Sequence, residues 1–545
     1  MTPTTRSPRL AFGAALAGAA LILASCSSGS TGSTSSSPTS AAGSKGTAAA
    51  AGAVHNGGTI IVGLPAAPEA LDPTTEATYY GRIVFADMCL GLYGVDAQGT
   101  TAPVLATAAP TVSAGGTLLT IPLRSGVKFN DGTPFDAAAV VTSLNRDISL
   151  PTSARASSLS DVASVTASGS TTVQIKLKAP DAAIPTILAG RSGIVMSPTA
   201  LAKEGSSFSQ HPVCVGPYSF SSRPSLDQIT LTKSPYYYDA AAVHAATIEF
   251  TVITDPSTCY SNLLSGAINV AACLAPNDVA LLAHNSLYTT QTVITNAYGG
   301  IDINVGNANG YNKPSAAPNN PLAQNASLRK ALEMSISRTT LNKVVFSGVN
   351  QPGCTPLAPS SPYHTSIGCT HRNIAAATAL VKASGVATPI HLTLMVPTGT
   401  LNVQEGELIA SEAAPAGFAI KVQSTEFTTA LSAAEHGSYQ MFEIGWSGRV
   451  DPDQNISPFY TPGSALNYAG VQDPTLLSLL AQGRTTQSVS GRKAVYAHVE
   501  QQLLSQLGII YLYHEAFQLA SSSKIVGVQF TPDGIIHLAS AGFTG

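Results

Sequence analysis

The stretch of sequence that decides the fold covers residues 123–135 and reads LRSGVKFNDGTPF. Apolar and polar residues alternate over residues 117–123, which predicts a strand that leads into this stretch. The dipeptide Asp131-Gly132, preceded by Asn130, is a strong turn signal. Residues 135–144 then have the spacing of a helix, for which Asp136 is a suitable N-cap. The stretch is therefore predicted to form a strand, a turn and a helix in succession.

Strand and helix patterns also mix on both sides of this stretch. A long helix is predicted over residues 328–346, where apolar residues recur at three-, four- and five-residue steps and Gly348 follows as a stop. Further helices are predicted over residues 476–480 and 496–507. Strands are predicted over residues 59–64, 173–177, 509–512 and 526–530. No repeat of fixed period is present, so the predicted class is α/β or α+β with several lobes.

The first residues have the pattern of a bacterial lipoprotein signal peptide. Arg6 and Arg9 precede an apolar run over residues 10–24, which is shorter than the ~20 residues of a membrane-spanning helix. Residues 23–26, LASC, resemble the lipobox, whose cysteine carries the lipid. We therefore expect residues 1–25 to be cleaved and Cys26 to be lipidated, on the extracytoplasmic face of the bacterial cell membrane. A plain secretory signal with a chance cysteine is the alternative.

The next segment, residues 26–57, is predicted to be a flexible tether behind the lipidated cysteine. Ser, Thr, Gly and Ala dominate it, and after Cys26 its only charged residue is Lys45. Residues 58–545 are dense in Val, Ile, Leu and Tyr and are enough for two or three domains. No other apolar segment is long enough to span a membrane, so the mature part is predicted to be soluble.

Charge and motif content exclude several function classes. Charged residues make up 10% of the chain and the formal net charge is −3, so a nucleic-acid partner is not expected. Residues 445–448, GWSG, do not have their second glycine at the place that a GxSxG nucleophile elbow requires. HExxH and Walker motifs are absent, and no GxGxxG follows a strand. Asp451 and Asp453 flank Pro452, an arrangement that shapes a turn as readily as an acid/base pair. We therefore predict a binding protein with no enzymatic activity, no cofactor and no metal site.

The cysteines are predicted to form disulfides. With Cys26 assigned to lipid, six of seven remain, and an even number in an exported chain favours disulfides. Sequence alone does not choose their connectivity. The close pairs Cys259–Cys273 and Cys354–Cys369 would each close a loop of about fifteen residues, worth about 3 kcal/mol in the chain-entropy model. Cys89–Cys214 would follow by elimination, and free buried thiols are the alternative.

Six segments match one family pattern, in order along the chain. They are TIIVGL at 59–64 followed by LDP at 71–73, LRSGVKFNDGTPF at 123–135, VGPYSF at 215–220, LLSGAIN at 263–269, LRKAL through ISR at 328–338, and NYAG at 467–470. Asn130 stands where His is commoner, and Asn269 where Asp is. Over roughly residues 58–540 the chain thus resembles the extracellular solute-binding proteins of ABC importers, in the class (family 5) with dipeptide-, oligopeptide- and nickel-binding members.

The resemblance implies an α/β, two-lobed periplasmic-binding-protein-like fold with an extra subdomain. Two crossing strands would form the hinge, and the ligand cleft would lie between the lobes. Lobe I would comprise residues 58–300 plus 511–545, with the subdomain at about residues 81–197, and lobe II residues 301–510. A small-molecule or peptide ligand that touches both lobes would stabilise the closed state, which an ABC permease then recognises. The tether would raise the local concentration near that permease, and a monomer is expected.

The most informative candidate site is residues 445–453, GWSGRVDPD. In peptide-binding relatives this segment pairs its backbone with the peptide, and three residues after the tryptophan stands an aspartate that binds the peptide amine. Here that position is Arg449, and the stretch before Asp-Pro-Asp is one residue shorter. An arginine suits a carboxylate, a phosphate or an acidic sugar. The alternative is a structural ion pair of Arg449 with Asp451 or Asp453.

Other candidate ligand contacts surround Arg449. Gly445, Ser447 and Asp451 belong to the same segment, and Trp446, the only tryptophan, is either a flat wall of the site or a core anchor. Outside this segment, the candidates are Tyr218, which could equally be a packed turn residue, and Tyr80, beside Tyr79 near the first lobe boundary.

We therefore expect a lipid-anchored receptor subunit of an ABC importer for a small polar solute that is anionic or peptide-like. The rival hypothesis is a lipoprotein with the same fold that regulates envelope assembly through protein contacts and imports nothing. A buried polar cleft favours the receptor, whereas an apolar or filled cleft favours the regulator.

Overall fold

The computed structural model describes residues 54–225, 227–311 and 313–545. The predicted signal peptide, Cys26 and the tether as far as residue 53 lie outside the described residues. Among the helices of the described part, none is both long and apolar enough to cross a membrane.

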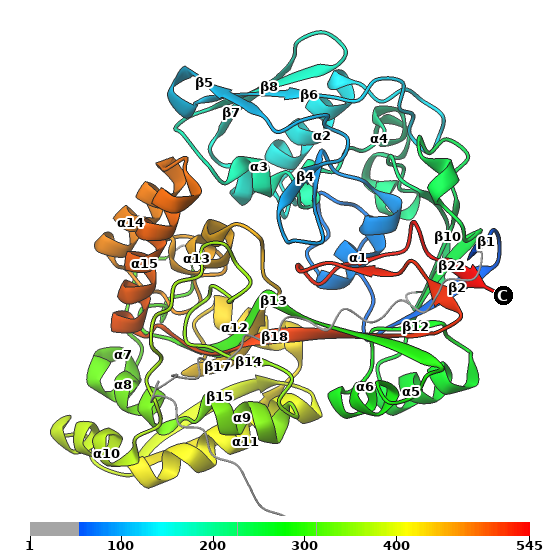
Figure 1. The fold of residues 1–545 in the computed structure, drawn as a ribbon. Coiled ribbons are helices and arrows are strands. Elements are labelled where there is room, and N and C mark those ends of the chain that lie inside the picture. Colours follow the sequence, from blue (N-terminus) through cyan, green and yellow to red (C-terminus); the bar gives the residue numbers. More distant parts are fainter. Residues whose placement is uncertain (1–53, 226, 312) are drawn as a thin grey trace, which may run out of the picture. The chain divides into compact units, whose positions relative to one another are not determined.

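A mixed sheet of eleven strands forms the centre of the fold (Figure 1). Its order is β16-β15-β17-β13-β18-β12-β2-β11-β10-β9, and β14 pairs with β18. Parallel pairs, such as β2 with β11, adjoin antiparallel ones, such as β13 with β18, which confirms the predicted α/β class. The strands are β2 (Thr59–Leu64), β9 (Tyr218–Ser225), β10 (Gln228–Lys233), β11 (Thr247–Val252), β12 (Val270–Ala271), β13 (Tyr288–Ile303), β14 (Gln351–Pro352), β15 (Ile390–Pro397), β16 (Phe418–Thr425), β17 (Met441–Trp446) and β18 (Ile509–Ser522).

Smaller sheets lie around the central one. A four-stranded sheet in the order β5-β6-β8-β7 is drawn at the top of Figure 1, and β1, β22 and β19 form a sheet at the C-terminal end of the chain. Two further pairs are β3 with β4 and β20 with β21. These strands are β1 (Val54–His55), β3 (Tyr93–Val95), β4 (Thr101–Pro103), β5 (Thr111–Ser113), β6 (Leu118–Pro122), β7 (Val162–Ala167), β8 (Thr172–Leu177), β19 (Ile525–Val526), β20 (Gln529–Phe530), β21 (Ile536–His537) and β22 (Gly542–Thr544).

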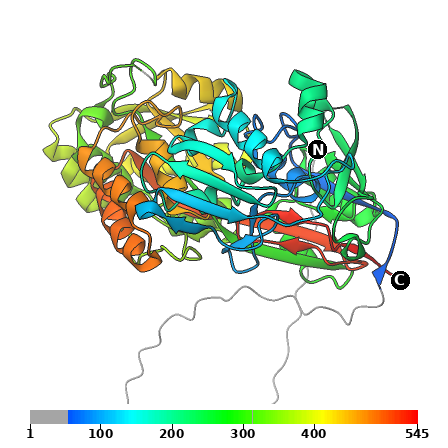
Figure 2. The ribbon, with the colours of Figure 1, turned by 90° about the horizontal axis from the view of Figure 1, so that it is seen from above.

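Helices alternate with these strands along the chain. In both ribbon views α14 and α15 lie at one end of the described part and β22 at the other (Figures 1 and 2). The helices are α1 (Tyr79–Met88), α2 (Ala137–Ser149), α3 (Ile184–Ile187), α4 (Pro198–Glu204), α5 (Pro256–Ser265), α6 (Pro276–Leu282), α7 (Pro321–Gln324), α8 (Ala326–Ser335), α9 (Arg338–Val345), α10 (Ile374–Ala383), α11 (Thr400–Ala413), α12 (Phe427–Glu435), α13 (Pro452–Tyr460), α14 (Pro474–Thr485) and α15 (Val489–Gln506).

The buried apolar side chains form separate clusters that share β13 and β18. Leu519 of β18 packs in the cluster around β2, α1 and β11, whereas Leu512 of the same strand packs in the cluster around β15, α8 and α11. In β13, Tyr288 packs against the α5–α6 cluster and Ile301 belongs to the β15 cluster. The predicted lobe boundaries fall inside these two strands, and the boundaries themselves stay predictions.

The stretch at residues 123–135 folds as its sequence predicts. β6 precedes it, Gly132 adopts a positive φ of 83° in the turn, and Asp136 caps α2 by accepting a hydrogen bond from the Ala139 amide at 3.0 Å. Asn130 donates to the Tyr218 carbonyl at 2.8 Å and accepts from the Ser234 hydroxyl at 2.7 Å. This single amide side chain therefore joins two of the six matching segments.

The prediction of a single helix over residues 328–346 is wrong in one respect, because the chain forms two helices there, α8 and α9. Ile336 between them is extended, with ψ of 131°. Ser337 explains the break: its hydroxyl caps α9 by accepting from the Thr340 amide at 3.2 Å, and its own amide donates to the Glu412 carboxylate at 2.6 Å. A serine that caps a new helix competes with continuation of the old one.

Other boundaries also differ from the prediction. The strand expected at residues 526–530 is two short strands, β19 and β20, because Gly527 has a φ of +79° and a Cβ there would lie 2.1 Å from the Ser540 carbonyl. Residues 509–512 begin the longer strand β18, and residues 476–480 and 173–177 lie within α14 and β8. The helix predicted at 496–507 begins earlier, at Val489, where Ser488 is its N-cap.

All three predicted disulfides are confirmed. Cys89–Cys214, Cys259–Cys273 and Cys354–Cys369 have Cα–Cα distances of 4.9, 5.9 and 5.5 Å. The alternative of free buried thiols is therefore wrong for these six residues.

Candidate functional site

The candidate site begins at an open edge of β17. On one side β17 pairs with β13 along its whole length, whereas on the other side β15 pairs only with Met441 and Phe442. Residues 443–446 thus have an edge without a strand partner in the described part of the chain, and Gly445 is exposed. Such an edge can take up the backbone of an extended ligand.

Trp446 and Arg449 lie together immediately after this edge. The Arg449 guanidinium stacks over the Trp446 ring, with its carbon 4.3 Å from the ring centroid, and Nη1 donates to the Ser447 hydroxyl and the Gly448 carbonyl at 3.2 and 2.6 Å. Gly448 has a φ of +72°, and a Cβ there would lie 2.4 Å from the Asn296 carbonyl carbon. The turn that places Arg449 therefore requires glycine.

Asn455 of α13 fixes the backbone of this segment. Its Oδ1 accepts from the Trp446 indole at 3.0 Å and from the Arg449 amide at 2.7 Å, and its Nδ2 donates to the Arg449 carbonyl at 2.7 Å. Only an amide side chain supplies both an acceptor and donors in this geometry. Sequence reasoning missed Asn455; its place four residues after Asp451, in the helix that follows the segment, was the available signal.

Asp451 is held by the fold. It caps α13 by accepting from the Asp453 amide at 2.9 Å, and its two carboxylate oxygens receive Arg492 Nη1 and Nη2 at 2.7 and 2.8 Å. Both side chains of this ion pair are almost fully buried. The carboxylate of Asp453 lies 4.0 Å from Arg484. Neither carboxylate pairs with Arg449, so the structural ion pair considered as an alternative for Arg449 is not formed.

Three further arginines lie near Arg449 and had no signal in the sequence. They are Arg82 of α1, Arg155 and Arg191, and together with Arg449 they form what we term the arginine group. Burial and the neighbouring guanidinium groups hold the pKa of Arg449 and that of Arg191 well below the usual range of arginine. Burial also lowers the pKa of Arg155, to about 10. The four guanidinium groups therefore lie within electrostatic reach of one another.

Backbone carbonyls just before α1 position two of these arginines. Arg191 donates to the carbonyls of Thr78 and Ala77 at 2.6 and 3.1 Å, and Arg155 donates to that of Glu76 at 3.0 Å. Arg82 forms an ion pair with Asp533 at 2.7 Å. Arg82 Nη1 and Arg155 Nε are buried without a hydrogen-bond partner in the described part of the chain. Unpartnered buried donors on charged groups are rare and point to a functional role.

The two predicted tyrosines differ in their surroundings. Tyr80 is half-buried at the start of α1, and burial followed by the charge of Glu515 raises its pKa to about 12. Its ring meets that of Tyr79 edge to face at 5.5 Å, and Tyr79 packs on Phe517 of β18 at 4.7 Å. Tyr218 is fully buried among core residues. Tyr79 lies within electrostatic reach of Arg82, so its neighbour Tyr80 lies close to the arginine group. Tyr218, in contrast, packs in the core.

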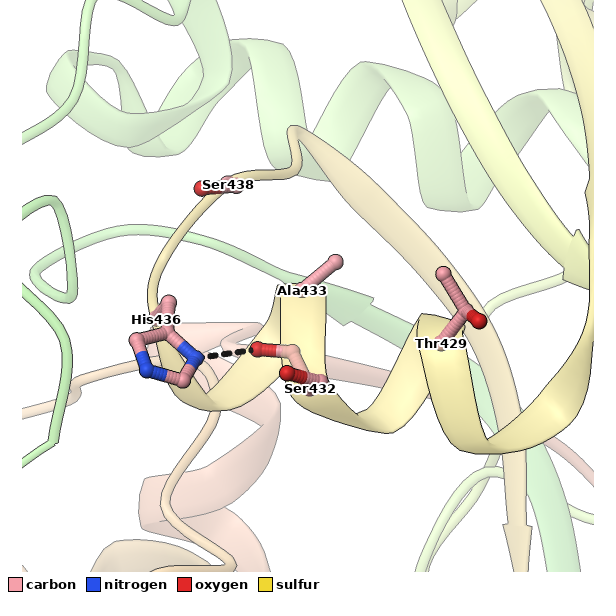
Figure 3. A pocket seen from close by; sticks show the side chains of 5 residues that line it. All are labelled: Thr429, Ser432, Ala433, His436 and Ser438. Carbon is pink, nitrogen blue, oxygen red and sulfur yellow. Dashed lines mark hydrogen bonds between the residues drawn. The ribbon is translucent and has the colours of Figure 1, made fainter.

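Hollows on the surface lie elsewhere. One, of about 490 Å³, is lined by Thr429, Ser432, Ala433, His436 and Ser438 beside α12 (Figure 3). The His436 ring bonds through Nδ1 to the Ser432 carbonyl at 2.7 Å, and the residues that line this hollow include no Arg, Lys, Asp or Glu. A second hollow, of about 360 Å³, lies by β15 and β17.

Within the described residues, no group of three His, Cys, Asp or Glu side chains is placed to hold a metal ion.

Comparison with known proteins agrees with the resemblance seen in the sequence. A glutathione-binding protein of Shigella dysenteriae serotype 1 is 28% identical over 476 residues, which cover 85% of this chain and 90% of that protein. Among solved structures, the substrate-binding protein CtaP of Listeria monocytogenes superposes with a TM-score of 0.78 at 20% identity, over 90% of this chain and 100% of that one. AgaA from A. tumefaciens R10, in complex with agropinic acid, gives 0.76 at 21% identity, over 90% and 99%.

These structural likenesses confirm the predicted two-lobed fold. The family model for bacterial extracellular solute-binding proteins, family 5 middle, matches residues 100–467. The chain belongs to the family 5 bacterial extracellular solute-binding proteins, the solute-binding components of ABC importers.

Proposed function

We propose that this chain is a lipid-anchored receptor that captures a small anionic or peptide-like solute and delivers it to an ABC permease. The observation that carries the proposal is the Arg449 guanidinium, which stacks on Trp446 beside the open edge of β17 and pairs with no carboxylate in the described residues. A planar guanidinium fixed in this way suits two parallel hydrogen bonds to a carboxylate. Gly445, Ser447 and Tyr80 are further proposed contacts.

The electrostatics support an anionic rather than a cationic ligand. Arg82, Arg155 and Arg191 add positive charge around Arg449. At an effective dielectric near 20, the repulsion between neighbouring unit charges is on the order of a few kcal/mol, and a bound anion would replace it by attraction. A free peptide amine at this position would instead add to the repulsion. The chemistry of the relatives' ligands agrees, because glutathione and agropinic acid are both small organic acids.

The proposed binding role also separates the receptor from the rival regulator. A regulator that acts only through protein contacts has no use for unpartnered guanidinium nitrogens in its interior, whereas a receptor for a polar solute does. The absence of a catalytic motif in the sequence supports binding and delivery without chemical conversion of the solute.

Removal of the Arg449 charge is expected to weaken solute binding. With glutathione as the probe, Arg449→Gln should raise the Kd about ten- to a hundredfold, since a charge-assisted hydrogen bond contributes about 1.5–3 kcal/mol. Arg449→Lys should recover only part of the loss, because an ammonium lacks the planar fork. Isothermal titration calorimetry measures both. Arg372→Gln, which removes an exposed arginine, is the matched control. If Arg449→Gln and this control bind glutathione with equal affinity, the anion hypothesis is wrong.

The proposed anchor predicts a second outcome. Cys26→Ala should abolish incorporation of a radioactive fatty acid and leave the protein either released or as an uncleaved precursor. The parent chain, labelled in the same cells, is the positive control. Label in the mutant at the level of the parent would place the anchor at another residue.

A further inference from the structure

The arginine group has more positive charge than its surroundings neutralise. Asp533 forms an ion pair with Arg82, and Glu76 lies within electrostatic reach of Arg155 and Arg191. Asp147 also faces Arg155, but burial raises the pKa of Asp147 to about 7, so it is only partly ionised at neutral pH. Besides Asp147, two carboxylates, those of Asp533 and Glu76, therefore lie near the four guanidinium groups. The excess of about two positive charges is what a solute with two anionic groups would balance.

One of the two carboxylates has little capacity left for the arginines. The oxygens of Glu76 accept hydrogen bonds from the Ala70 amide and the Thr78 amide, each at 2.6 Å, and from the Thr78 hydroxyl. Glu76 also lies within electrostatic reach of Arg223, whose Nε is a further buried donor without a hydrogen-bond partner in the described part of the chain. Glu76 therefore orders the chain before α1 and does not bind the guanidinium groups directly.

The unpartnered donors lie on two separate parts of the chain. Arg82 belongs to α1; its Nη2 is fixed by Asp533 and its Nη1 is the unpartnered donor. Arg155, whose Nε is the other unpartnered donor, belongs to the loop after α2. Arg449 is carried by the loop between β17 and α13 and is fixed by Trp446 and Asn455. Arg82 and Arg155 form one set and Arg449 the other. Each set is held by its own partners, so each can bind one anionic group.

We propose that the arginine group is one site for a solute with two separate anionic groups, one bound at Arg449 and the other at Arg82 and Arg155. This inference rests on the proposed function and narrows its solute class from anions in general to dianions, above all dicarboxylates. A ligand of this kind connects α1 with the β17–α13 loop through its own two charges. A monoanion neutralises one set and leaves the other unpaired.

The test compares probes that differ in one anionic group. Calorimetry at constant ionic strength is carried out on the mature protein with glutathione, its glycine monoethyl ester, glutarate and acetate. Glutathione is expected to bind at least about tenfold more tightly than its ester, and glutarate more tightly than acetate. If neither probe with two carboxylates binds more tightly than its counterpart with one, the inference is wrong.

Variants locate the second anion. In Arg82→Gln combined with Asp533→Asn, which avoids leaving a buried carboxylate alone, the affinity for glutathione is expected to fall to that of the ester, while the affinity for the ester stays nearly constant. Arg155→Gln serves as a second variant should the first fail to fold. Arg124→Gln is the control, since that side chain is exposed and lies over Tyr238.

The two levels of the proposal fail differently. If binding depends on Arg449 but the Arg82/Asp533 variant weakens glutathione and its ester equally, the dianion inference fails and the proposed function stands. If binding of these probes is indifferent to Arg449→Gln, the proposed function fails with it.

Discussion

Replacement of Arg492 by methionine is expected to lower the free energy of unfolding by about 3–5 kcal/mol, the loss that follows when one partner of a buried ion pair is removed. Asp451 would be left as a buried carboxylate without a counter-charge, because its two oxygens receive both Arg492 guanidinium nitrogens at 2.7 and 2.8 Å. Arg492 also donates to the Gly483 carbonyl and lies over the rings of Tyr363 and Tyr496 at 5.1 and 5.6 Å, so packing is lost as well.

Urea denaturation of the purified protein measures this loss. Arg484→Met is the matched control, because its Nε lies 4.0 Å from Asp453 and its side chain is 32% exposed. The control should lose clearly less, because its contact with Asp453 is longer and its arginine is partly exposed. A loss for Arg492→Met as small as that of the control would contradict a structural role for the Asp451–Arg492 pair. Since Asp451 caps the helix that carries Asn455, the variant should also disturb the Trp446–Arg449 segment.

Removal of the Cys89–Cys214 disulfide is expected to destabilise the protein by about 4–5 kcal/mol in the chain-entropy model, because the loop that it closes is long. The two cysteines are 125 residues apart and are buried. The bond holds the end of α1, which carries Arg82, against residues 214–217, where a Cβ at Gly216 would lie 2.1 Å from the Met88 carbonyl. Loss of the bond should therefore loosen one half of the proposed site.

The comparison is between Cys89→Ala with Cys214→Ala and the matched pair Cys354→Ala with Cys369→Ala. The second pair closes a loop of only 15 residues, so its removal should destabilise by about 3 kcal/mol, roughly 2 kcal/mol less. Chemical denaturation under non-reducing conditions measures both. Equal losses, or a larger loss for the short loop, would show that chain entropy does not set the contribution of the long one.

Local signals in the sequence predicted the parts of the fold that depend on neighbours along the chain. The turn at Asp131-Gly132, the Asp136 cap and the strand over residues 59–64 each depend on a few adjacent residues, and the structure confirms them. The break at Ser337 was missed because the periodic apolar pattern continues through it. Its cause, the hydrogen bond from the Ser337 amide to Glu412, links residues 75 positions apart.

The candidate site was predictable only in part, for the same physical reason. The residues of the GWSGR segment could be named from sequence because they are contiguous and match a family motif. Arg82, Arg155 and Arg191 come from separate segments, and their convergence on Arg449 is a product of tertiary folding. The ion-pair partner of Asp451 could not be predicted either. Arg449 is only two residues away in the sequence, whereas the actual partner, Arg492, is 41 residues away.

The central claim is that this receptor recognises acid groups through Arg449, and the solute that it carries from the cell tests that claim most directly. The protein is purified without denaturation, and small molecules released from it by acid are identified by mass spectrometry and titrated back by calorimetry. We expect a solute with ionised acid groups whose Kd rises about ten- to a hundredfold in Arg449→Gln. Release of a neutral or purely cationic solute that rebinds the parent and Arg449→Gln with equal affinity would contradict the account.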